Sequence, residues 1–345
     1  TYKIASIPGD GIGVEVVAAG LRALYALAER AGTFRFEVMN FDWGTDRYKR
    51  EGTLMPADGA QDLIGFDAIL FGAVGAPDVP DHVTLWGLRL NICQPLGQYA
   101  NVRPTRILPG IKSPLAGLTD KDLDWVIVRE NSEGEYSGQG GRSHRGQPHE
   151  VATDVAVFTR VGVERIIRFA FELAQVRPRK LLTVVTKSNA QRHGMVLWDD
   201  VAREVARDFP DVTWDKMLVD AMTVRMVMQP QSLDTIVATN LHADVLSDLA
   251  AALSGSIGVA PTANLNPKRT TPSMFEPIHG SAFDITGKGI ANPVGTFWSA
   301  AMLLEHIGEA EAAAQLMQAI ESVTANQELH TPDLGGGATT EKVTA

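Results

Sequence analysis

Short apolar runs alternate along the chain with longer segments in which apolar residues recur every three to four positions. The runs have the length of β-strands, and the longer segments have the period of amphipathic α-helices. We predict strands at residues 2–7, 68–72, 125–129, 181–185 and 235–239, and helices at residues 14–30, 159–175, 194–208 and 296–323. Such alternation is typical of α/β proteins in which part of a sheet is parallel.

Two segments depart from this alternation. Residues 137–153 are rich in glycine, arginine and histidine, so they form either a loop or a projecting β arm used in subunit contact. From Thr331 onward the chain has three consecutive glycines, residues 335–337, and few apolar residues. We therefore expect a loosely ordered tail.

The stretch at residues 240–248, Asn-Leu-His-Ala-Asp-Val-Leu-Ser-Asp, carries the most chemical information. Asn240 is expected to cap the start of a helix, because its side chain can accept hydrogen bonds from free backbone N–H groups. Asp244 and Asp248 are four residues apart, so both carboxylates lie on one face of that helix. Such a pair suits a hard cation such as Mg²⁺ or Mn²⁺, although a solvated acidic helix face has the same pattern.

Other candidate side chains lie in or after predicted strands. Arg103 and Arg129 could grip a dicarboxylate, since a guanidinium group binds a carboxylate through paired hydrogen bonds, or each could be structural. Lys187 follows the strand at 181–185, at the edge where open α/β sheets bind ligands. Tyr136 is either a proton donor or a packed aromatic side chain.

Two loops add further candidates. The loop at residues 276–284 offers His279 for ring stacking and Asp284 for a pair of ribose hydroxyl groups. Residues 7–13, Ile-Pro-Gly-Asp-Gly-Ile-Gly, follow the first strand and open a helix. Their G-x-G-x-G spacing differs from the G-x-G-x-x-G of Rossmann folds, so we predict a tight turn near a ligand and no Rossmann dinucleotide loop.

Composition narrows the class of protein. The chain has 345 residues, 45% of them hydrophobic, which is enough for a large core and two domains. A net charge of −10 argues against nucleic acid as main partner, and it means that an anionic substrate needs local arginines. One cysteine, Cys93, excludes an intrachain disulfide. Without a signal-peptide pattern or a membrane-spanning run, we expect a cytoplasmic protein.

Together and in this order, these segments resemble the metal-dependent β-decarboxylating dehydrogenases, the family that includes isopropylmalate and isocitrate dehydrogenases. The resemblance extends from Ile4 to about Val343. The blocks that carry it are residues 7–13, 99–104, 128–136, 186–189, 220–222, 240–261 and 275–293. Residues 41–44 (Phe-Asp-Trp-Gly) and 81–87 (Asp-His-Val-Thr-Leu-Trp-Gly) are similar to the branch of that family that oxidises tartrate and D-malate.

The resemblance implies a two-domain α/β fold, distinct from the Rossmann fold, with the active site in the cleft between the domains. Residues 1–99 and 252–345 would form the cofactor-binding domain with both termini, and residues 100–251 would carry the dimer interface and an arm at about 137–153. The protein would be a homodimer whose active sites are shared between subunits.

The resemblance also implies catalytic and metal-binding roles. Asp244 and Asp248 would bind Mn²⁺ or Mg²⁺, joined by Asp220 of the partner subunit. Lys187, also reaching across from the partner, would accept the proton of the substrate's 2-hydroxyl group. Tyr136 would protonate the enolate formed after decarboxylation. A monovalent cation such as K⁺ is a further candidate cofactor.

Substrate and cofactor contacts complete the implied site. Arg103, Arg129 and Asn189 would bind the substrate. The residues implied in binding NAD are His279, Gly280, Ser281, Ala282, Asp284, Ile285 and Asn292. An acidic residue at Asp284 is typical of members that use NAD, because a carboxylate accepts ribose hydroxyl groups and repels a 2′-phosphate.

The chain departs from the family pattern in one place. Relatives usually carry another arginine ten residues before Arg103, where this chain has Cys93. Arg89 lies one helical turn earlier, so it could bind the same carboxylate or recognise the substituent at C3 of the substrate.

We therefore expect NAD-dependent, metal-dependent oxidation of a 2-hydroxy dicarboxylic acid with β-decarboxylation. D-malate would give pyruvate and CO₂, and tartrate would give oxaloglycolate or a decarboxylated product. NAD-linked isopropylmalate or isocitrate oxidation would keep the same catalytic residues and change only the pocket around Arg89. A non-catalytic dicarboxylate-binding protein would keep the arginines but would not require Lys187, Tyr136 and the acidic metal ligands.

Overall fold

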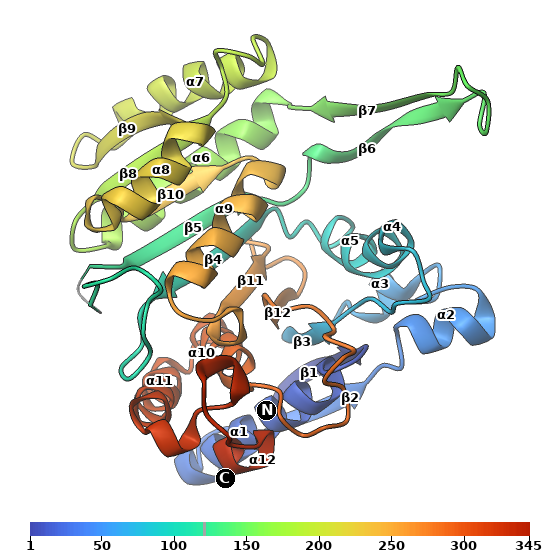
Figure 1. Ribbon diagram of the computed structural model, residues 1–345, viewed down its shortest axis with the longest axis vertical. Helices are drawn as coiled ribbons and strands as arrows, with labels where there is room; N and C mark the ends of the chain where they lie inside the picture. The colour runs from blue at the N-terminus through green and yellow to red at the C-terminus, as the bar shows by residue number, and fades with distance from the viewer. Residues whose placement is uncertain (120–121) are drawn as a thin grey trace.

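A ten-stranded sheet runs through the whole molecule, and a separate two-stranded ribbon projects from it (Figure 1). This computed structural model describes residues 1–119 and 122–345. Helices cover both faces of the large sheet, so the predicted α/β class is confirmed. Among the described residues, no helix is long and apolar enough to cross a membrane.

The strands of the large sheet follow the order β2-β1-β3-β12-β11-β4-β5-β10-β8-β9. Their bounds are β1 Tyr2–Gly9, β2 Phe36–Asn40, β3 Ala68–Ala73, β4 Ala100–Arg106, β5 Asp124–Glu130, β8 Leu181–Thr186, β9 Thr213–Leu218, β10 Thr235–Ala238, β11 Pro261–Leu265 and β12 Ser273–Pro277. The β11 strand is antiparallel to β12 and β4, and β4 is antiparallel to β5. The remaining pairs are parallel, which confirms the predicted parallel component.

The predicted helices at the start and middle of the chain are present within a few residues of their expected ends. The α-helices are α1 Gly13–Ala31, α2 Thr45–Glu51, α3 Gly59–Asp62, α4 Asp81–Thr84, α5 Leu90–Cys93, α6 Arg160–Val176, α7 Gly194–Val205, α8 Val219–Met228, α9 Asn240–Leu253, α10 Val294–Ile307, α11 Ala310–Ala325 and α12 Thr340–Thr344. A π-helical turn, Leu85–Arg89, joins α4 to α5. Short 3₁₀ helices occupy Ala206–Asp208, Pro230–Ser232, Ile257–Val259, Gln327–Leu329 and Pro332–Leu334.

The single helix predicted at residues 296–323 is wrong. It is two helices, because α10 ends at Gly308, whose φ of 97° is a left-handed conformation that a glycine adopts without steric cost. The next helix, α11, then packs beside α10.

Alternate residues of each central strand enter cores on opposite faces of the sheet. In β10, Val237 packs in the cluster beneath α6 and α7, whereas Ile236 and Ala238 pack with α8 and α9. In β1, Ile4 joins the cluster with α1 and α10, and Ala5 joins the cluster on the other face. This two-sided burial explains why the strands read as continuous apolar runs.

The segment at residues 137–153 belongs to a projecting β arm, so the loop alternative is wrong. Strands β6, Gly134–Ser143, and β7, Val151–Val157, pair antiparallel and extend away from the body (Figure 1). Most of their side chains are exposed. A role of the arm in subunit contact stays a prediction.

The expected loosely ordered tail is also wrong. Ala338 and Val343 are 3% and 5% exposed and belong to the core beside α1 and α10. The backbone N–H of Thr340 donates to the carbonyl of Gly289 at 2.9 Å, which ties α12 to the loop before α10. A few apolar residues at the right spacing are therefore enough to dock a glycine-rich tail.

The strand order supports the predicted division of the chain. Strands β1, β2, β3, β11 and β12 come from residues 1–99 and 252–345 and form one half of the sheet. Strands β4, β5, β8, β9 and β10 come from residues 100–251 and form the other half. We propose these segments as the two domains.

Candidate active site

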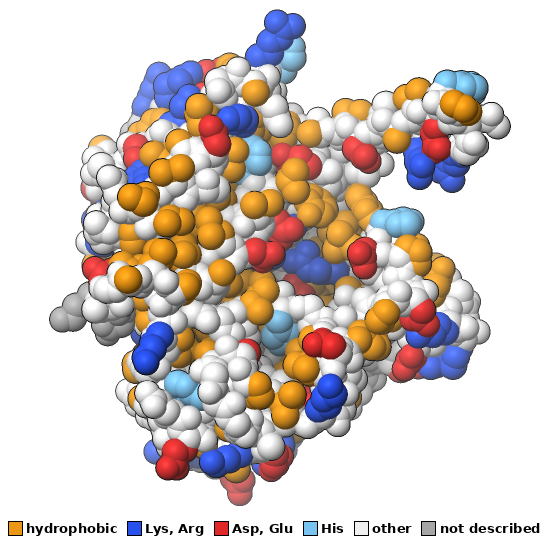
Figure 2. Space-filling model, in the orientation of Figure 1, with side chains coloured by type: hydrophobic (Ala, Val, Ile, Leu, Met, Phe, Trp, Pro, Cys, Tyr) orange, Lys and Arg blue, Asp and Glu red, His pale blue; other side chains and the backbone are white. Residues whose placement is uncertain are grey.

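A pocket of about 210 Å³ lies near the junction of the two halves of the sheet. The ends of β3 and β12 line one side of it, and β4, β5, β6 and the N-terminal part of α9 line the other. Figure 2 shows it as a hollow with basic side chains inside and acidic side chains near its border. The pocket therefore combines residues that the sequence assigned separately to substrate and cofactor.

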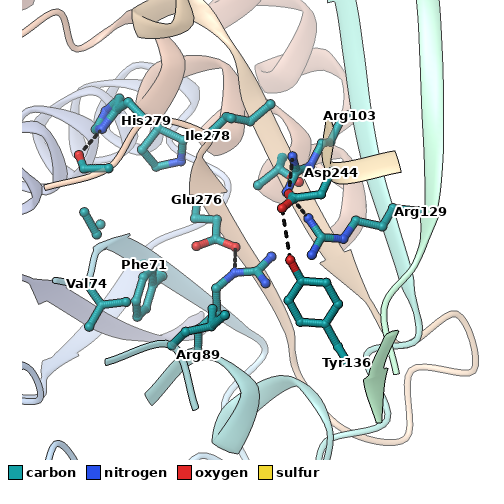
Figure 3. Close-up of a pocket in the computed structure, with 16 residues that line it drawn as sticks. Phe71, Val74, Arg89, Arg103, Arg129, Tyr136, Asp244, Glu276, Ile278 and His279 are labelled. Carbon is teal, nitrogen blue, oxygen red and sulfur yellow. Dashed lines mark hydrogen bonds and ion pairs between the residues drawn. The ribbon is translucent and has the colours of Figure 1, made fainter. Parts of the chain in front are cut away.

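Three arginines converge in this pocket (Figure 3): Arg89 from the π-helical turn, Arg103 from β4 and Arg129 from β5. Their exposed fractions are 8%, 5% and 2%. Burial and the nearby Arg129 lower the pKa of Arg103 to about 9. Placing positive groups together away from water is unfavourable unless an anion accompanies them. Among the described residues that line this pocket, only two are acidic, Asp244 and Glu276, against the three arginines, and this excess of basic groups favours binding of an anionic ligand.

Each of these guanidinium groups bonds to the protein through two nitrogens. Arg89 uses Nε and Nη2, whereas Arg103 and Arg129 use Nε and Nη1. The third nitrogen of each, Nη1 of Arg89 and Nη2 of the other two, makes no hydrogen bond to any residue that the structure describes. The pocket therefore keeps three cationic N–H groups free for a ligand with more than one carboxylate.

Asp244 is the fifth residue of α9 and faces two of these arginines. Its Oδ1 accepts hydrogen bonds from Arg129 and, at 3.4 Å, from Nη1 of Arg103, and its Oδ2 accepts from the hydroxyl of Tyr136 at 3.2 Å. Burial opposes ionisation of this carboxyl, but the guanidinium groups of Arg129 and Arg103 outweigh burial and lower the pKa of Asp244. Asp244 is therefore a carboxylate at neutral pH.

The start of α9 corrects one prediction. Thr239, not Asn240, caps the helix, since its hydroxyl accepts a hydrogen bond from the backbone N–H of His242 at 3.4 Å. Asn240 is the first helical residue, and its Oδ1 accepts from Nε of Arg129 at 2.8 Å. The asparagine thus orients a pocket arginine.

Tyr136 reaches the same pocket from β6. Its ring lies 5.2 Å from the guanidinium carbon of Arg129, measured to the ring centroid. Burial and the neighbouring Asp244 carboxylate raise the pKa of Tyr136. The phenol therefore keeps its proton at neutral pH, which suits a proton donor.

Asp248 follows Asp244 by one turn of α9 and is exposed. Desolvation and the negative charge of Asp244 raise the pKa of Asp248. A hard cation would relieve this repulsion, so the two oxygen donors fit a divalent ion such as Mg²⁺ or Mn²⁺. Among the described residues of one chain, no group of three acidic, histidine or cysteine side chains is arranged to hold a metal.

Lys187 and Asp220 lie together outside the pocket of their own chain. Nζ of Lys187 is 2.5 Å from Oδ1 of Asp220, whose side chain is 66% exposed. Asn189, two residues after the lysine, is also exposed. The single chain therefore does not bring these three predicted residues to Asp244.

Two of the residues predicted to bind the cofactor, His279 and Gly280, line the pocket. Burial lowers the pKa of His279, so its ring is neutral at physiological pH. Its Nδ1 lies 3.0 Å from the carbonyl of Gly280, whereas the buried Nε2 has no hydrogen-bond partner among the described residues. A buried, unpartnered ring nitrogen beside an open pocket fits a heteroaromatic ligand with its own donor or acceptor.

The glycine-rich turn after β1 packs against the predicted cofactor loop. The backbone N–H of Ile12 donates to the carbonyl of Ser281 at 2.8 Å, and the side chains of Ala282 and Ile285 pack in the small cluster around Ile12. Asp284 is exposed at the surface of this loop.

Asn292 is 6% exposed, and both ends of its amide bond within the protein. Its Nδ2 donates to Asp333 at 3.0 Å and its Oδ1 accepts from the N–H of Val294 at 3.0 Å. This side chain therefore holds the backbone before α10 against Asp333.

Two pocket features had no predicted role. Glu276, at the end of β12, lines the pocket and accepts a hydrogen bond from Nε of Arg89 at 2.8 Å. Residues 71–74, at the end of β3, line the pocket as well. Both lie where strands finish at the ligand-binding edge of a sheet, and that position is the signal that could have identified them.

Comparison with known proteins agrees with this geometry. The isocitrate/isopropylmalate dehydrogenase family model matches residues 3–345. This match, the α/β sheet and the pocket define the protein by class as a dehydrogenase. The chain belongs to the isocitrate/isopropylmalate dehydrogenase family.

Individual relatives cover almost the entire chain. A probable tartrate dehydrogenase/decarboxylase of Agrobacterium vitis is 72% identical over 99% of this chain and 96% of its own length. The decarboxylating D-malate dehydrogenase of Escherichia coli strain K12 is 50% identical over the same shares. The crystal structure of isocitrate dehydrogenase from Methylococcus capsulatus is 35% identical, covers 100% of this chain and 97% of that one, and has a TM-score of 0.90. The resemblance deduced from the sequence and the predicted fold are confirmed.

Proposed function

We propose that this protein catalyses the NAD-dependent, Mn²⁺- or Mg²⁺-dependent oxidation of tartrate, D-malate or both, with β-decarboxylation. The observation that carries the proposal is the convergence of Arg89, Arg103 and Arg129 with Tyr136 and Asp244 in one pocket, with three guanidinium nitrogens free for carboxylates. The similarity to proteins named tartrate dehydrogenase/decarboxylase and D-malate dehydrogenase supports the choice of substrate.

For D-malate, the balanced reaction converts the hydroxy acid and NAD⁺ into pyruvate, CO₂ and NADH. Arg103 and Arg129 bind the carboxylates, and Lys187 accepts the proton of the 2-hydroxyl group as C2 loses hydride. The C3–C4 bond then breaks, its electrons stay on the three-carbon fragment as an enolate, and CO₂ leaves. Tyr136, held as a phenol by its surroundings, protonates C3 of that enolate. Tartrate is oxidised at the same position.

A nicotinamide cofactor and a divalent ion would supply chemistry that these side chains lack. When bound, NAD⁺ provides the hydride acceptor and a divalent ion provides Lewis-acid stabilisation of developing negative charge. Asp244 and Asp248 would hold the ion, with Asp220 of the partner subunit. The residues that would contact NAD are His279, Gly280, Ser281, Ala282, Asp284, Ile285 and Asn292.

A homodimer with shared sites fits the exposed apolar surface of α8 and α9. Val224, Met228 and Val245 are 60%, 71% and 58% exposed, and hydrophobic side chains gather over this region in Figure 2. Exposed apolar residues that cluster in this way mark an interface. Asp220 lies in the first turn of α8, so a second copy covering this face would bring Asp220 and Lys187 toward the pocket of its partner.

The free, buried Cys93 is compatible with the reducing cytoplasm, which we propose as the location of the protein.

The direct test follows NADH absorbance with D-malate, the tartrate isomers, isocitrate and isopropylmalate, each with and without Mn²⁺. We expect Mn²⁺-dependent NADH formation with D-malate, tartrate or both, and much slower reduction with the other acids. Faster oxidation of isopropylmalate or isocitrate would overturn the assigned substrate. Activity with none of these acids would overturn the proposal as a whole.

A further inference from the structure

A buried lattice of amide side chains lies behind the pocket arginines. From its geometry we infer that Asn264 is a positioning residue that holds Arg89 and Arg103 as one rigid clamp for the substrate carboxylates. The inference rests on the proposed function insofar as the pocket binds a dicarboxylate. Asn264 lies in β11, is 0% exposed and is not among the residues that line the pocket, so it acts only through its neighbours.

Toward Arg89, Asn264 closes a ring of hydrogen bonds. Its Oδ1 accepts from Nη2 of Arg89 at 3.0 Å, and its Nδ2 donates to Oε1 of Glu276 at 2.8 Å. The same Glu276 oxygen accepts from Nε of Arg89 at 2.8 Å, a contact drawn in Figure 3. The edge of the guanidinium plane formed by Nε and Nη2 is thereby fixed, which sets the direction of the free Nη1.

Toward Arg103, Asn264 acts through a second amide. Asn101 stands directly opposite it in the β4–β11 ladder, and Nδ2 of Asn101 donates to Oδ1 of Asn264 at 2.8 Å. Oδ1 of Asn101 in turn accepts from Nε of Arg103 at 2.8 Å. Arg89 and Arg103 come from the two proposed domains, so these amides join the halves of the clamp.

The chemistry of an amide suits this position. The carbonyl oxygen of Asn264 accepts three hydrogen bonds, from Arg89, Asn101 and Asn131, and carries no net charge. It can therefore orient a guanidinium group without neutralising the charge that the substrate needs. Removing the Asn264 side chain would leave a buried N–H group of Asn101 and one of Asn131 without this acceptor. Arg89 would lose a direct hydrogen bond, and Arg103 would lose the support that Asn101 receives from Asn264.

The same lattice explains how Arg89, one helical turn before Cys93, is oriented toward the pocket. Cys93 is 1% exposed and packs in the core near Leu88 and Ile92. Arg89, at the end of the π-helical turn, enters the pocket instead and depends on Glu276 and Asn264 for its orientation. If Arg89 binds a substrate carboxylate, its orientation therefore depends on residues outside its own helix.

The test compares Asn264→Ala with Asn266→Ala. Asn266 is also buried, but it bonds to Leu96, Thr270 and Thr271 and to none of the pocket arginines. For the holoenzyme with Mn²⁺, we expect Asn264→Ala to raise the KM for D-malate or tartrate, and the Kd of the acid by calorimetry, about tenfold or more. The KM for NAD⁺ should change little. Asn266→Ala should leave the KM and Kd of the acid near wild type, even if it lowers the melting temperature.

A conservative exchange keeps the inference testable if the alanine variant does not fold. Asn264→Asp keeps the size of the side chain and the oxygen that accepts from Arg89, but it replaces the Nδ2 donor with an oxygen that faces Oε1 of Glu276. Facing carboxylate oxygens repel, and the added negative charge competes with the substrate for Arg89, so the KM and the Kd of the acid should rise. An unchanged KM and Kd of the acid in folded Asn264→Asp would overturn the inference.

The outcomes separate the two hypotheses. If the wild type oxidises the acid and Asn264→Ala binds it equally well, the positioning role is wrong and the proposed function stands. Equal losses of affinity in Asn264→Ala and Asn266→Ala would show a merely structural role and would also overturn the inference. A wild type that binds no dicarboxylate would overturn both.

Discussion

Replacing Gly11 by alanine tests whether the glycine-rich turn after β1 shapes the cofactor site. Gly11 has a φ of +58°, and a Cβ at this residue would lie 2.0 Å from the carbonyl oxygen of Ser281. That oxygen accepts the hydrogen bond from the N–H of Ile12 at 2.8 Å. The new methyl group would therefore separate the turn from the proposed cofactor loop.

The size of the effect follows from two contributions. An alanine in the left-handed conformation costs about 1–2 kcal/mol, and loss of the hydrogen bond between the segments costs about 1 kcal/mol more. The loop carrying Ser281 must retreat by about 1 Å, because Cβ contacts under 3.0 Å essentially never occur. If NAD⁺ binds only to the undisplaced loop, part of this cost weakens the binding of NAD⁺. A loss of about 1.4 kcal/mol in binding free energy raises the Kd of NAD⁺ about tenfold.

Gly32→Ala is the matched control. Gly32 has a similar φ of +66°, and a Cβ there would meet nothing within 4 Å. Both variants should lose stability in urea unfolding, but calorimetric titration with NAD⁺ should show the loss of affinity only in Gly11→Ala. Unchanged NAD⁺ affinity in Gly11→Ala, or an equal loss in both variants, would refute the reasoning.

Four further predictions concern catalysis, specificity, stability and assembly. Tyr136→Phe keeps the ring over Arg129 but removes the proton, so kcat for D-malate should fall about a hundredfold with little change in KM; an unchanged kcat would exclude the proton-donor role. Asp284→Ser should shift the ratio of kcat/KM values for NAD⁺ and NADP⁺ toward NADP⁺, and a wild type that already prefers NADP⁺ would disprove the role of Asp284. Burial lowers the pKa of His306 to about 4. The unfolded chain, with a histidine pKa of about 6.5, therefore binds more protons between these values, and stability falls as pH drops through that window. Urea unfolding should show a weaker pH dependence in His306→Gln, and an identical slope would contradict the assignment. Mixed dimers of Lys187→Ala and Asp244→Asn subunits should regain activity at the one site that keeps both side chains, and no recovery in verified mixed dimers would argue against shared sites.

Much of the fold could be predicted because apolar periodicity records burial directly. The strands at β1, β3, β5, β8 and β10 are buried on both faces, so each appears as an unbroken apolar run. In β2 and β9 several side chains are partly or fully exposed, so these edge strands have no such run and were not predicted. The break at Gly308 was missed because apolar residues continue on both sides of it.

Site residues could be nominated from the sequence where one residue type has one chemistry, but not where a role depends on partners that are distant in the sequence. Arg103, Arg129 and Tyr136 could be nominated singly, and the structure brings them together with Asp244. The part played by Asn264 depends on residues as far apart in sequence as Arg89 and Glu276, which no local pattern connects. The choice between Thr239 and Asn240 as helix cap likewise depended on Arg129, which occupies the side chain of Asn240.

The central claim is that one pocket oxidises and decarboxylates a 2-hydroxy dicarboxylic acid. The most direct measurement records NADH and CO₂ together from D-malate and NAD⁺ in the presence of Mn²⁺. We predict equal molar amounts of NADH, CO₂ and pyruvate, with formation of all three abolished by a chelator and restored by Mn²⁺. NADH without CO₂ from D-malate, or equal rates with and without the metal, would contradict it.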